Sequence, residues 1–150
     1  IEGKDFWFKY ISLGKYSSLQ ESFKNEVSQL SNKNEIILIY PIPEVGWDVP
    51  NKIWISRKNK LFAKSNLTTV TTSYKVYKER NKSSFEMLDS VTGKNIYRVY
   101  PHKLFCNTLI KNRCITHDNK DIFYADDDHP SLKGSEMIND LIIAEIKKIN

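Results

Sequence analysis

The sequence predicts a single domain of the α/β class, built on a parallel sheet. Residues 36–40 are five hydrophobic residues in a row, and a strand that is apolar on both faces is typical of the centre of a parallel sheet. Predicted helices and strands alternate along the chain, an order that forms parallel sheets through right-handed crossovers. The length of 150 residues is typical of one domain.

The first predicted helix covers residues 18–31. Ser18 followed by Glu21 forms a capping box, a pattern typical of a helix start. Apolar residues then recur at helical spacing, so one face is expected to be buried: Leu19, Phe23, Val27 and Leu30. The aromatic segment at residues 6–11 fits a helix or a strand equally, and no element is assigned to it.

A loop follows the predicted strand at residues 36–40. Residues 41–50 contain three prolines and one glycine, which exclude regular structure there. Loops at the carboxyl ends of parallel strands bind ligands in open α/β sheets. This loop is therefore expected to lie at a site.

A second helix and a second strand are predicted next. Thr71 or Thr72 is expected to cap the helix, which ends before Gly93. Its buried stripe consists of Tyr74, Tyr77, Phe85, Leu88 and Val91. Residues 96–100 predict the strand, and Pro101 ends it.

The chain closes with a short extended segment at residues 122–125 and a final helix. Ser131 is expected to cap this helix. Its apolar face consists of Ile138, Leu141, Ile142, Ile146 and Ile149.

The composition excludes several classes of protein. Aromatic residues make up 12% of the chain, which argues against disorder, and no apolar run approaches the ~20 residues of a membrane helix. The net charge of +5 permits an acidic partner. Because the basic residues are scattered and no arginine-rich stripe accompanies them, no nucleic-acid partner is expected.

Cys106 and Cys114 are the only cysteines, with seven residues between them. This spacing permits a local disulfide and equally permits two free buried thiols. It does not match a zinc site, and His102 and His117 are too irregularly placed to complete one, so no metal is expected. Both histidines are expected to be surface or packing residues.

The segment Asp126-x-x-His129, just before the last helix, carries the clearest chemical signal. A histidine acts as a general base for a hydroxyl nucleophile when a carboxylate fixes its tautomer and stabilises the imidazolium that forms. A three-residue spacing lets both side chains meet within one turn. Taken alone, the run Asp126–Asp128 also fits a solvated acidic turn or a cation site.

Three separated motifs occur in a specific order: Pro41-x-Pro43-Glu44-x-Gly46-x-x-Val49-Pro50, then Pro101-x-x-x-Phe105-Cys106 with Cys114, then Tyr124-x-Asp126-x-x-His129-x-Ser131-x-x-Gly134. They resemble the SGNH (GDSL-like) domain that is fused to bacterial membrane acyltransferases of the acyltransferase-3 family. Those proteins O-acetylate cell-surface polysaccharides. The resemblance extends from about Gly3 to the end of the chain and implies part of a three-layer α/β/α SGNH-hydrolase-like fold with a parallel sheet.

The resemblance assigns roles to several residues. It implies that His129 is the general base, that Asp126 orients it, and that Cys106 and Cys114 form a disulfide in the periplasm, as part of a bacterial inner-membrane protein. It implies no cofactor, an acyl donor delivered by a membrane acyltransferase domain, and a polysaccharide acceptor. Trp47 is a candidate sugar platform or packs inward, and Glu44 binds sugar hydroxyls or pairs with a local lysine.

One part of the family pattern is missing. SGNH enzymes carry the nucleophilic serine in a Gly-Asp-Ser block upstream of the histidine, and this sequence has none; Asp89-Ser90 follows Leu88 instead. Residues 1–150 are therefore expected to form the C-terminal portion of the domain, inactive alone and prone to dimerise through exposed apolar surface. A non-catalytic glycan-binding accessory module and a secreted SGNH carbohydrate esterase are the alternatives.

Overall fold

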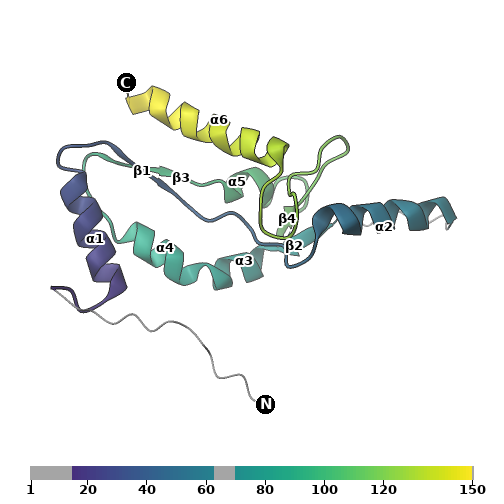
Figure 1. Ribbon diagram of the computed structural model, residues 1–150, viewed down its shortest axis with the longest axis horizontal. Helices are drawn as coiled ribbons and strands as arrows, with labels where there is room; N and C mark the ends of the chain where they lie inside the picture. The colour runs from purple at the N-terminus through teal and green to yellow at the C-terminus, as the bar shows by residue number, and fades with distance from the viewer. Residues whose placement is uncertain (1–14, 63–69, 150) are drawn as a thin grey trace, which may run out of the picture.

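The computed structural model describes residues 15–62 and 70–149, so the aromatic segment at residues 6–11 lies outside the described part (Figure 1). Helices and strands alternate along it, as predicted for an α/β domain. The helices are α1 (Leu19–Leu30), α2 (Val49–Phe62), α3 (Tyr74–Arg80), α4 (Lys82–Asp89), α5 (His102–Phe105) and α6 (Leu132–Ile149). The strands are β1 (Ile36–Ile39), β2 (Thr71–Ser73), β3 (Ile96–Val99) and β4 (Arg113–Ile115).

The predicted strands pair as a parallel sheet. Strands β1 and β3 lie side by side, with Ile36 opposite Ile96 and Ile39 opposite Val99. Figure 1 shows α6 on one side of this pair and α4 on the other, an arrangement of three layers. Among the described residues β1 pairs with β3 alone, so its other edge carries no strand.

One face of β1 is better covered than the other. Leu38 and Tyr40 are buried against α1 and α4, where they pack with Phe23 and Phe85. Ile39, on the opposite face, is 48% exposed. A central strand is expected to be covered on both faces, so this end of β1 lacks part of its cover.

The first helix begins as the capping box predicts. The Ser18 hydroxyl accepts a hydrogen bond from the Glu21 backbone N–H at 3.1 Å. The Glu21 carboxylate bonds Ser17 rather than Ser18, accepting from its backbone N–H at 2.9 Å and its hydroxyl at 2.6 Å. These bonds lower the pKa of Glu21.

The predicted cap at Thr71 or Thr72 is wrong. Both threonines lie in β2, which pairs antiparallel with β4, and Ser73 caps α3 by accepting from the Val76 N–H at 3.3 Å. Threonine is β-branched and favours extended backbone, and the Thr71 hydroxyl accepts from Arg113 Nε at 2.9 Å across the strand pair. The expected single helix is divided at Asn81 into α3 and α4.

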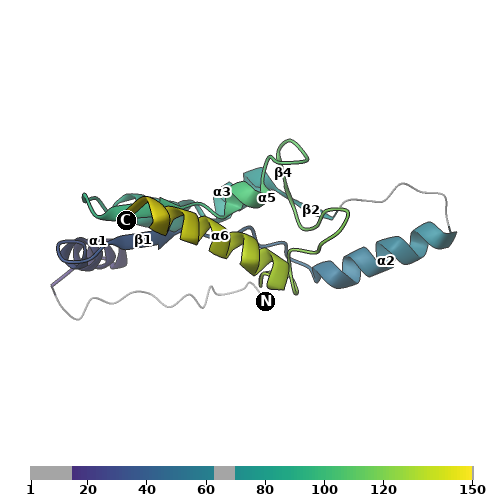
Figure 2. The same cartoon turned by 90° about the horizontal axis from the view of Figure 1, so that it is seen from above.

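The irregular loop predicted for residues 41–50 ends earlier than expected, because Val49 and Pro50 begin α2, a helix that the sequence analysis does not predict. Proline is tolerated in the first turn of a helix, where its missing N–H has no intrahelical partner. The Asp48 carboxylate accepts from the Asn51 N–H at 2.7 Å and completes the start of the helix. Figure 2 shows α2 extending away from α6, and Trp54 on it is 61% exposed.

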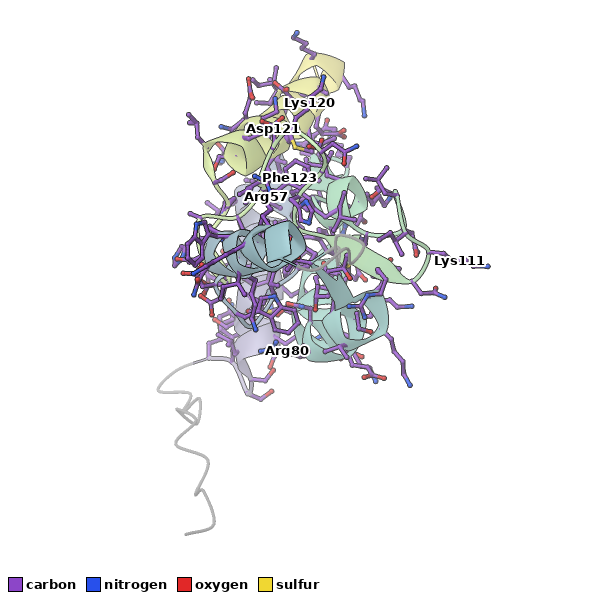
Figure 3. The ribbon with its side chains drawn as sticks, turned by 90° about the vertical axis from the view of Figure 1, so that its right-hand side faces the viewer. Arg57, Arg80, Lys111, Lys120, Asp121 and Phe123 are labelled. Atoms are coloured by element: carbon purple, nitrogen blue, oxygen red, sulfur yellow. A yellow bond between two sulfur atoms is a disulfide. The ribbon has the colours of Figure 1, made fainter. Side chains whose placement is uncertain are left out.

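The segment before α6 joins the main core. Phe123 and Tyr124 are buried in one cluster with Val45, Val49 and Phe105. Their backbone is extended, as predicted, with isolated bridges rather than a full strand. Figure 3 shows Phe123 inside the molecule, between α6 and α2.

Helix α6 begins at the predicted cap. The Ser131 hydroxyl accepts from the Gly134 N–H at 3.1 Å and donates to the Ile122 carbonyl at 2.6 Å. The predicted apolar face is only partly covered, since Ile138 packs against the core while Ile146 is 42% exposed. No helix in the described ranges is long and apolar enough to cross a membrane.

Gly134 lies where α6 packs closely against the backbone of Phe123, and replacing it with alanine is expected to destabilise the domain. An added Cβ would lie 2.2 Å from the Phe123 carbonyl oxygen, so the backbone must shift. We expect the free energy of unfolding to fall by about 1–3 kcal/mol in a urea titration, despite alanine's higher helix propensity.

Gly93→Ala is the matched control, because its added Cβ would meet only side-chain atoms, at 3.2 and 3.4 Å. A Gly134→Ala domain as stable as the Gly93→Ala domain would contradict the close approach of α6 to Phe123.

Candidate active site

The Asp126–His129 turn is attached to the loop that leaves β1. The Val45 N–H donates to the Asp127 carbonyl at 2.8 Å, and the Val49 N–H donates to the Asp126 carbonyl at 3.2 Å. The buried Tyr124 hydroxyl donates to the Pro43 carbonyl at 2.7 Å. The turn and the proline-rich loop are therefore held together at the carboxyl end of β1, where open α/β sheets bind ligands.

The structure brings Asp126 and His129 together. His129 Nδ1 lies 2.9 Å from Asp126 Oδ2. The other carboxylate oxygen, Oδ1, accepts from the backbone N–H groups of His129 at 2.8 Å and of Asp128 at 3.0 Å. One carboxylate thus fixes both the turn and the imidazole ring.

Hydrogen bonding and charge lower the pKa of Asp126 and raise the pKa of His129, so both shifts favour the charged pair. The two backbone N–H bonds and His129 lower the pKa of Asp126 to about 2. The hydrogen bond that His129 donates to Asp126 and the charge of Asp126, followed by the charge of Asp128, raise the pKa of His129. The side chain of His129 is 73% exposed, so solvent screens these effects.

The hydrogen bond to Asp126 also selects the tautomer of the neutral ring. With Nδ1–H donating to the carboxylate, Nε2 is the acceptor nitrogen. No described residue forms a hydrogen bond to Nε2. The exposed ring therefore offers a proton acceptor to a group outside the described residues.

Asp128 is a second neighbour of the imidazole that the sequence analysis did not assign. Its Oδ1 lies 2.9 Å from His129 Nδ1. In the sequence, only the run of three aspartates indicates a second carboxylate near the imidazole, and that run does not distinguish Asp127 from Asp128. The oxygens of Asp126 and Asp128 with His129 nitrogen form a ligand set for a cation, but the hydrogen bonds already account for their positions.

Trp47 and Glu44 lie on the loop that holds the turn. Trp47 is 39% exposed rather than packed inward. Glu44 forms an ion pair, but with an arginine rather than a lysine: its Oε2 lies 3.0 Å from Arg80 Nη2. Both side chains are accessible to a ligand from solvent.

Ser90 is not the missing nucleophile. Its hydroxyl donates to the Met87 carbonyl at 2.7 Å at the end of α4, and neighbouring Asp89 accepts from the Tyr40 hydroxyl. Ser131, the serine nearest His129 in sequence, caps α6. No serine hydroxyl in the described ranges bonds His129.

The two remaining histidines differ in environment. His117 is a structural residue, since its Nε2 accepts from the Val70 N–H at 3.3 Å and its Nδ1 lies 2.9 Å from the Asp118 carbonyl. His102 is 6% exposed and lies among aromatic rings.

Cys106 and Cys114 are joined by a disulfide. The bridge packs against Tyr77 and fixes the chain between α5 and β4. A loop of this length gains about 2–3 kcal/mol of stability from such a link.

The basic residues lie apart on the surface. Figure 3 shows Arg57, Arg80, Lys111 and Lys120 on separate parts of the molecule. These four side chains do not form a single cationic stripe of the kind that tracks a nucleic-acid backbone.

Comparison with known proteins identifies the family. The protein-family model described as SGNH domain (fused to AT3 domains) matches residues 3–144, which include the whole Asp126–His129 turn and both cysteines. No curated protein and no solved structure matches the chain. The family match agrees with the parallel sheet of the fold, and the chain therefore belongs to the SGNH domains that are fused to AT3 domains.

Proposed function

We propose that this chain supplies the general base of an acyl-transferring SGNH domain in a cell-surface polysaccharide O-acyltransferase. The family implies a module of the hydrolase or acyltransferase type. The observation that supports the assignment is the His129 ring, which Asp126 orients through Nδ1 while Nε2 has no partner among the described residues. This is the arrangement that a general base requires.

In the first half-reaction a serine hydroxyl attacks the carbonyl carbon of the acyl donor. His129 Nε2 takes the hydroxyl proton, and the Asp126 carboxylate stabilises the imidazolium that forms. Collapse of the tetrahedral intermediate transfers that proton to the leaving group and leaves an acyl-serine. The acetyl group is then joined to the domain by an ester bond.

In the second half-reaction a sugar hydroxyl attacks the acyl-serine. Nε2 removes its proton, the new ester forms, and the proton returns to the serine oxygen. Water in place of the sugar would give hydrolysis instead. Trp47 and Glu44, exposed on the adjoining loop, are the proposed contacts for the sugar.

The serine is proposed to come from another part of the same domain, upstream of this chain. The sequence has no Gly-Asp-Ser block, and β1 has an edge without a strand. A further parallel strand at this edge would bring its own carboxyl end next to the Asp126–His129 turn. Residues 1–150 are then the C-terminal portion of the domain and inactive alone.

The uncovered surface also supports a proposed tendency to self-associate. Ile39 on β1 and Ile143 and Ile146 on α6 are all more than 40% exposed. Without the remainder of the domain, these apolar side chains favour dimers of the isolated chain.

The proposed location is the periplasm, in a bacterial inner-membrane protein. Fusion to AT3 domains indicates a membrane protein, and the disulfide is compatible with an extracytoplasmic compartment. The membrane acyltransferase domain would deliver the acyl donor. The proposal includes no cofactor.

Labelling with a fluorophosphonate, which reacts with activated serines, tests whether the serine lies upstream while the histidine and the aspartate lie in this chain. We expect the full-length protein to be labelled at a serine upstream of this chain, and the isolated 150-residue chain to remain unlabelled. Mass spectrometry of the labelled peptide identifies the serine.

The rate of this labelling should fall by about 10³-fold or more in His129→Ala full-length protein, because the serine loses its base. Labelling at the same rate in both proteins would contradict the role of His129. No labelling of the unmodified full-length protein would favour a non-catalytic glycan-binding module, whose sugar binding would not need the histidine.

A further inference from the structure

A pocket lies between α3, α4 and the start of α5, apart from the Asp126–His129 turn. Its volume is about 240 Å³. Four rings form its walls: Tyr74, Tyr77, Phe85 and His102. Four charged residues complete the lining: Lys78, Lys82, Glu86 and Asp89. Figure 2 shows α3 and α5 close together, in agreement with this shared lining.

The walls are fixed before any ligand binds. The His102 ring lies 5.4 Å from the Tyr77 ring and 5.6 Å from the Phe85 ring, measured between centroids. The Tyr77 hydroxyl donates to the Pro41 carbonyl at 2.7 Å, and the ring packs against the disulfide. A preformed wall reduces the entropy lost on binding.

His102 has an unused hydrogen-bonding group in this wall. The residue is 6% exposed, and its Nδ1 is buried with no hydrogen-bond partner among the described residues. Buried polar atoms in native proteins are normally paired, so an unpaired one requires an explanation. Desolvation lowers the pKa of His102, which keeps the ring neutral and able to accept a hydrogen bond.

The edge of the pocket is polar. Lys78 Nζ lies 4.8 Å from the centre of the Tyr74 ring and forms no ion pair with a carboxylate among the described residues. Glu86 Oε1 lies 3.8 Å from Lys82 Nζ, a loose pair on the surface. The site therefore combines flat apolar walls with a donor and an acceptor at its mouth.

We propose that this pocket binds one hexopyranose unit of a glycan chain. A pyranose ring presents an apolar C–H face to aromatic walls and a rim of hydroxyls to charged groups. A purely apolar ligand would leave His102 Nδ1 without a partner and would make no use of the charged groups at the edge. The volume lies below the ~300–1,000 Å³ of pockets for drug-sized ligands, so it fits a single ring rather than an oligosaccharide.

The site would hold a glycan at a second point, beyond the sugar contacts proposed for Trp47 and Glu44. Tyr77 and the proline-rich loop are joined through the Pro41 carbonyl, so the pocket and the loop share one support. The binding itself does not depend on whether His129 is catalytic. Only the purpose of the pocket, which is to retain a polysaccharide during acetylation, depends on the proposed function.

Saturation-transfer NMR tests the site, because it reports weak binding to proteins of any size. The probes are the methyl glycosides of glucose, galactose, N-acetylglucosamine and rhamnose, added separately to the full-length protein. We expect at least one to bind with a millimolar dissociation constant, with strongest saturation on its C–H protons. Saturation of none of the four would overturn the proposal.

Two variants locate the bound sugar. Tyr74→Ala removes a stacking wall and His102→Phe keeps the ring but removes its nitrogens; each should weaken binding about 3–10-fold. Trp54→Ala, an exposed aromatic on α2 outside the pocket, is the control and should bind as the unmodified protein does. Unchanged binding in both pocket variants would also overturn the proposal.

Loss of binding in Trp47→Ala alone would place the sugar on the proline-rich loop instead. Fluorophosphonate labelling of the serine separates the two proposals. His102→Phe should leave its rate unchanged, whereas His129→Ala should lower that rate without altering sugar binding.

Discussion

Replacing His129 with alanine in the full-length protein is expected to abolish polysaccharide O-acetylation. In the proposed mechanism the ring provides the acceptor nitrogen for both half-reactions, so neither the serine nor the sugar hydroxyl would be deprotonated without it. Loss of the histidine of a catalytic triad lowers kcat by on the order of 10⁶. Ester-linked acetate released from the purified polysaccharide should fall to the level of cells that lack the gene.

The side chain of His129 is largely exposed, so its removal should not unfold the domain. Added imidazole should restore part of the activity by occupying the vacated space. Leu132→Ala is the matched control, because this residue lies three positions further along and is 90% exposed. Acetylation that persists in the His129→Ala protein would exclude the assigned mechanism.

Asp126→Asn is expected to lower activity by about 10²–10⁴-fold while leaving the turn folded. An asparagine Oδ1 still accepts the backbone N–H groups of Asp128 and His129. The amide does not stabilise an imidazolium, and it can hold the ring in the wrong tautomer. Asp128, also 2.9 Å from Nδ1, retains part of the effect, so the double variant with Asp128→Asn should be less active still.

The same substitution should move the pH dependence of the reaction. Asp126 raises the pKa of His129, and the base must be neutral to accept a proton, so activity of the unmodified protein falls as the pH drops through this raised pKa. In Asp126→Asn the pKa returns toward its ordinary value, and the acid limb of the kcat/KM profile moves to lower pH. An NMR titration of the His129 ring should show the same shift.

Asp127→Asn is the control for both measurements. This carboxylate is exposed, raises the pKa of His129 least among the three aspartates, and forms no hydrogen bond or ion pair with the ring, while its backbone carbonyl accepts a bond from the loop. The acid limb of the kcat/KM profile of the Asp127→Asn protein should remain almost unchanged. An equal shift in Asp127→Asn and Asp126→Asn would show that general charge, rather than the hydrogen bond, sets the pKa.

Features encoded over a few neighbouring residues could be predicted from the sequence. Ser18 with Glu21 marked α1, and Ser131 marked α6, because both caps are formed by residues three positions apart. The Asp126–His129 pair was predictable for the same reason. The parallel pairing of β1 with β3 followed from the alternation of helices and strands.

Features that depend on distant segments could not be predicted. Thr71 and Thr72 are suitable helix caps by type, but Arg113, 42 positions from Thr71, holds this segment in a strand. The Glu44–Arg80 pair and the pocket around His102 likewise join separate parts of the chain. Pro50 was misleading because its effect depends on its position within the first turn of α2.

The bonds from Val45, Val49 and Tyr124 have a consequence for how such an enzyme matures. They anchor the Asp126–His129 turn to the loop that leaves β1. If the serine lies in an upstream part of the domain, as proposed, the proton acceptor is in position before that alcohol arrives. Newly made protein would then acquire reactivity in a single docking event, when the two halves close. An esterase-like activity would be withheld from every incompletely assembled molecule.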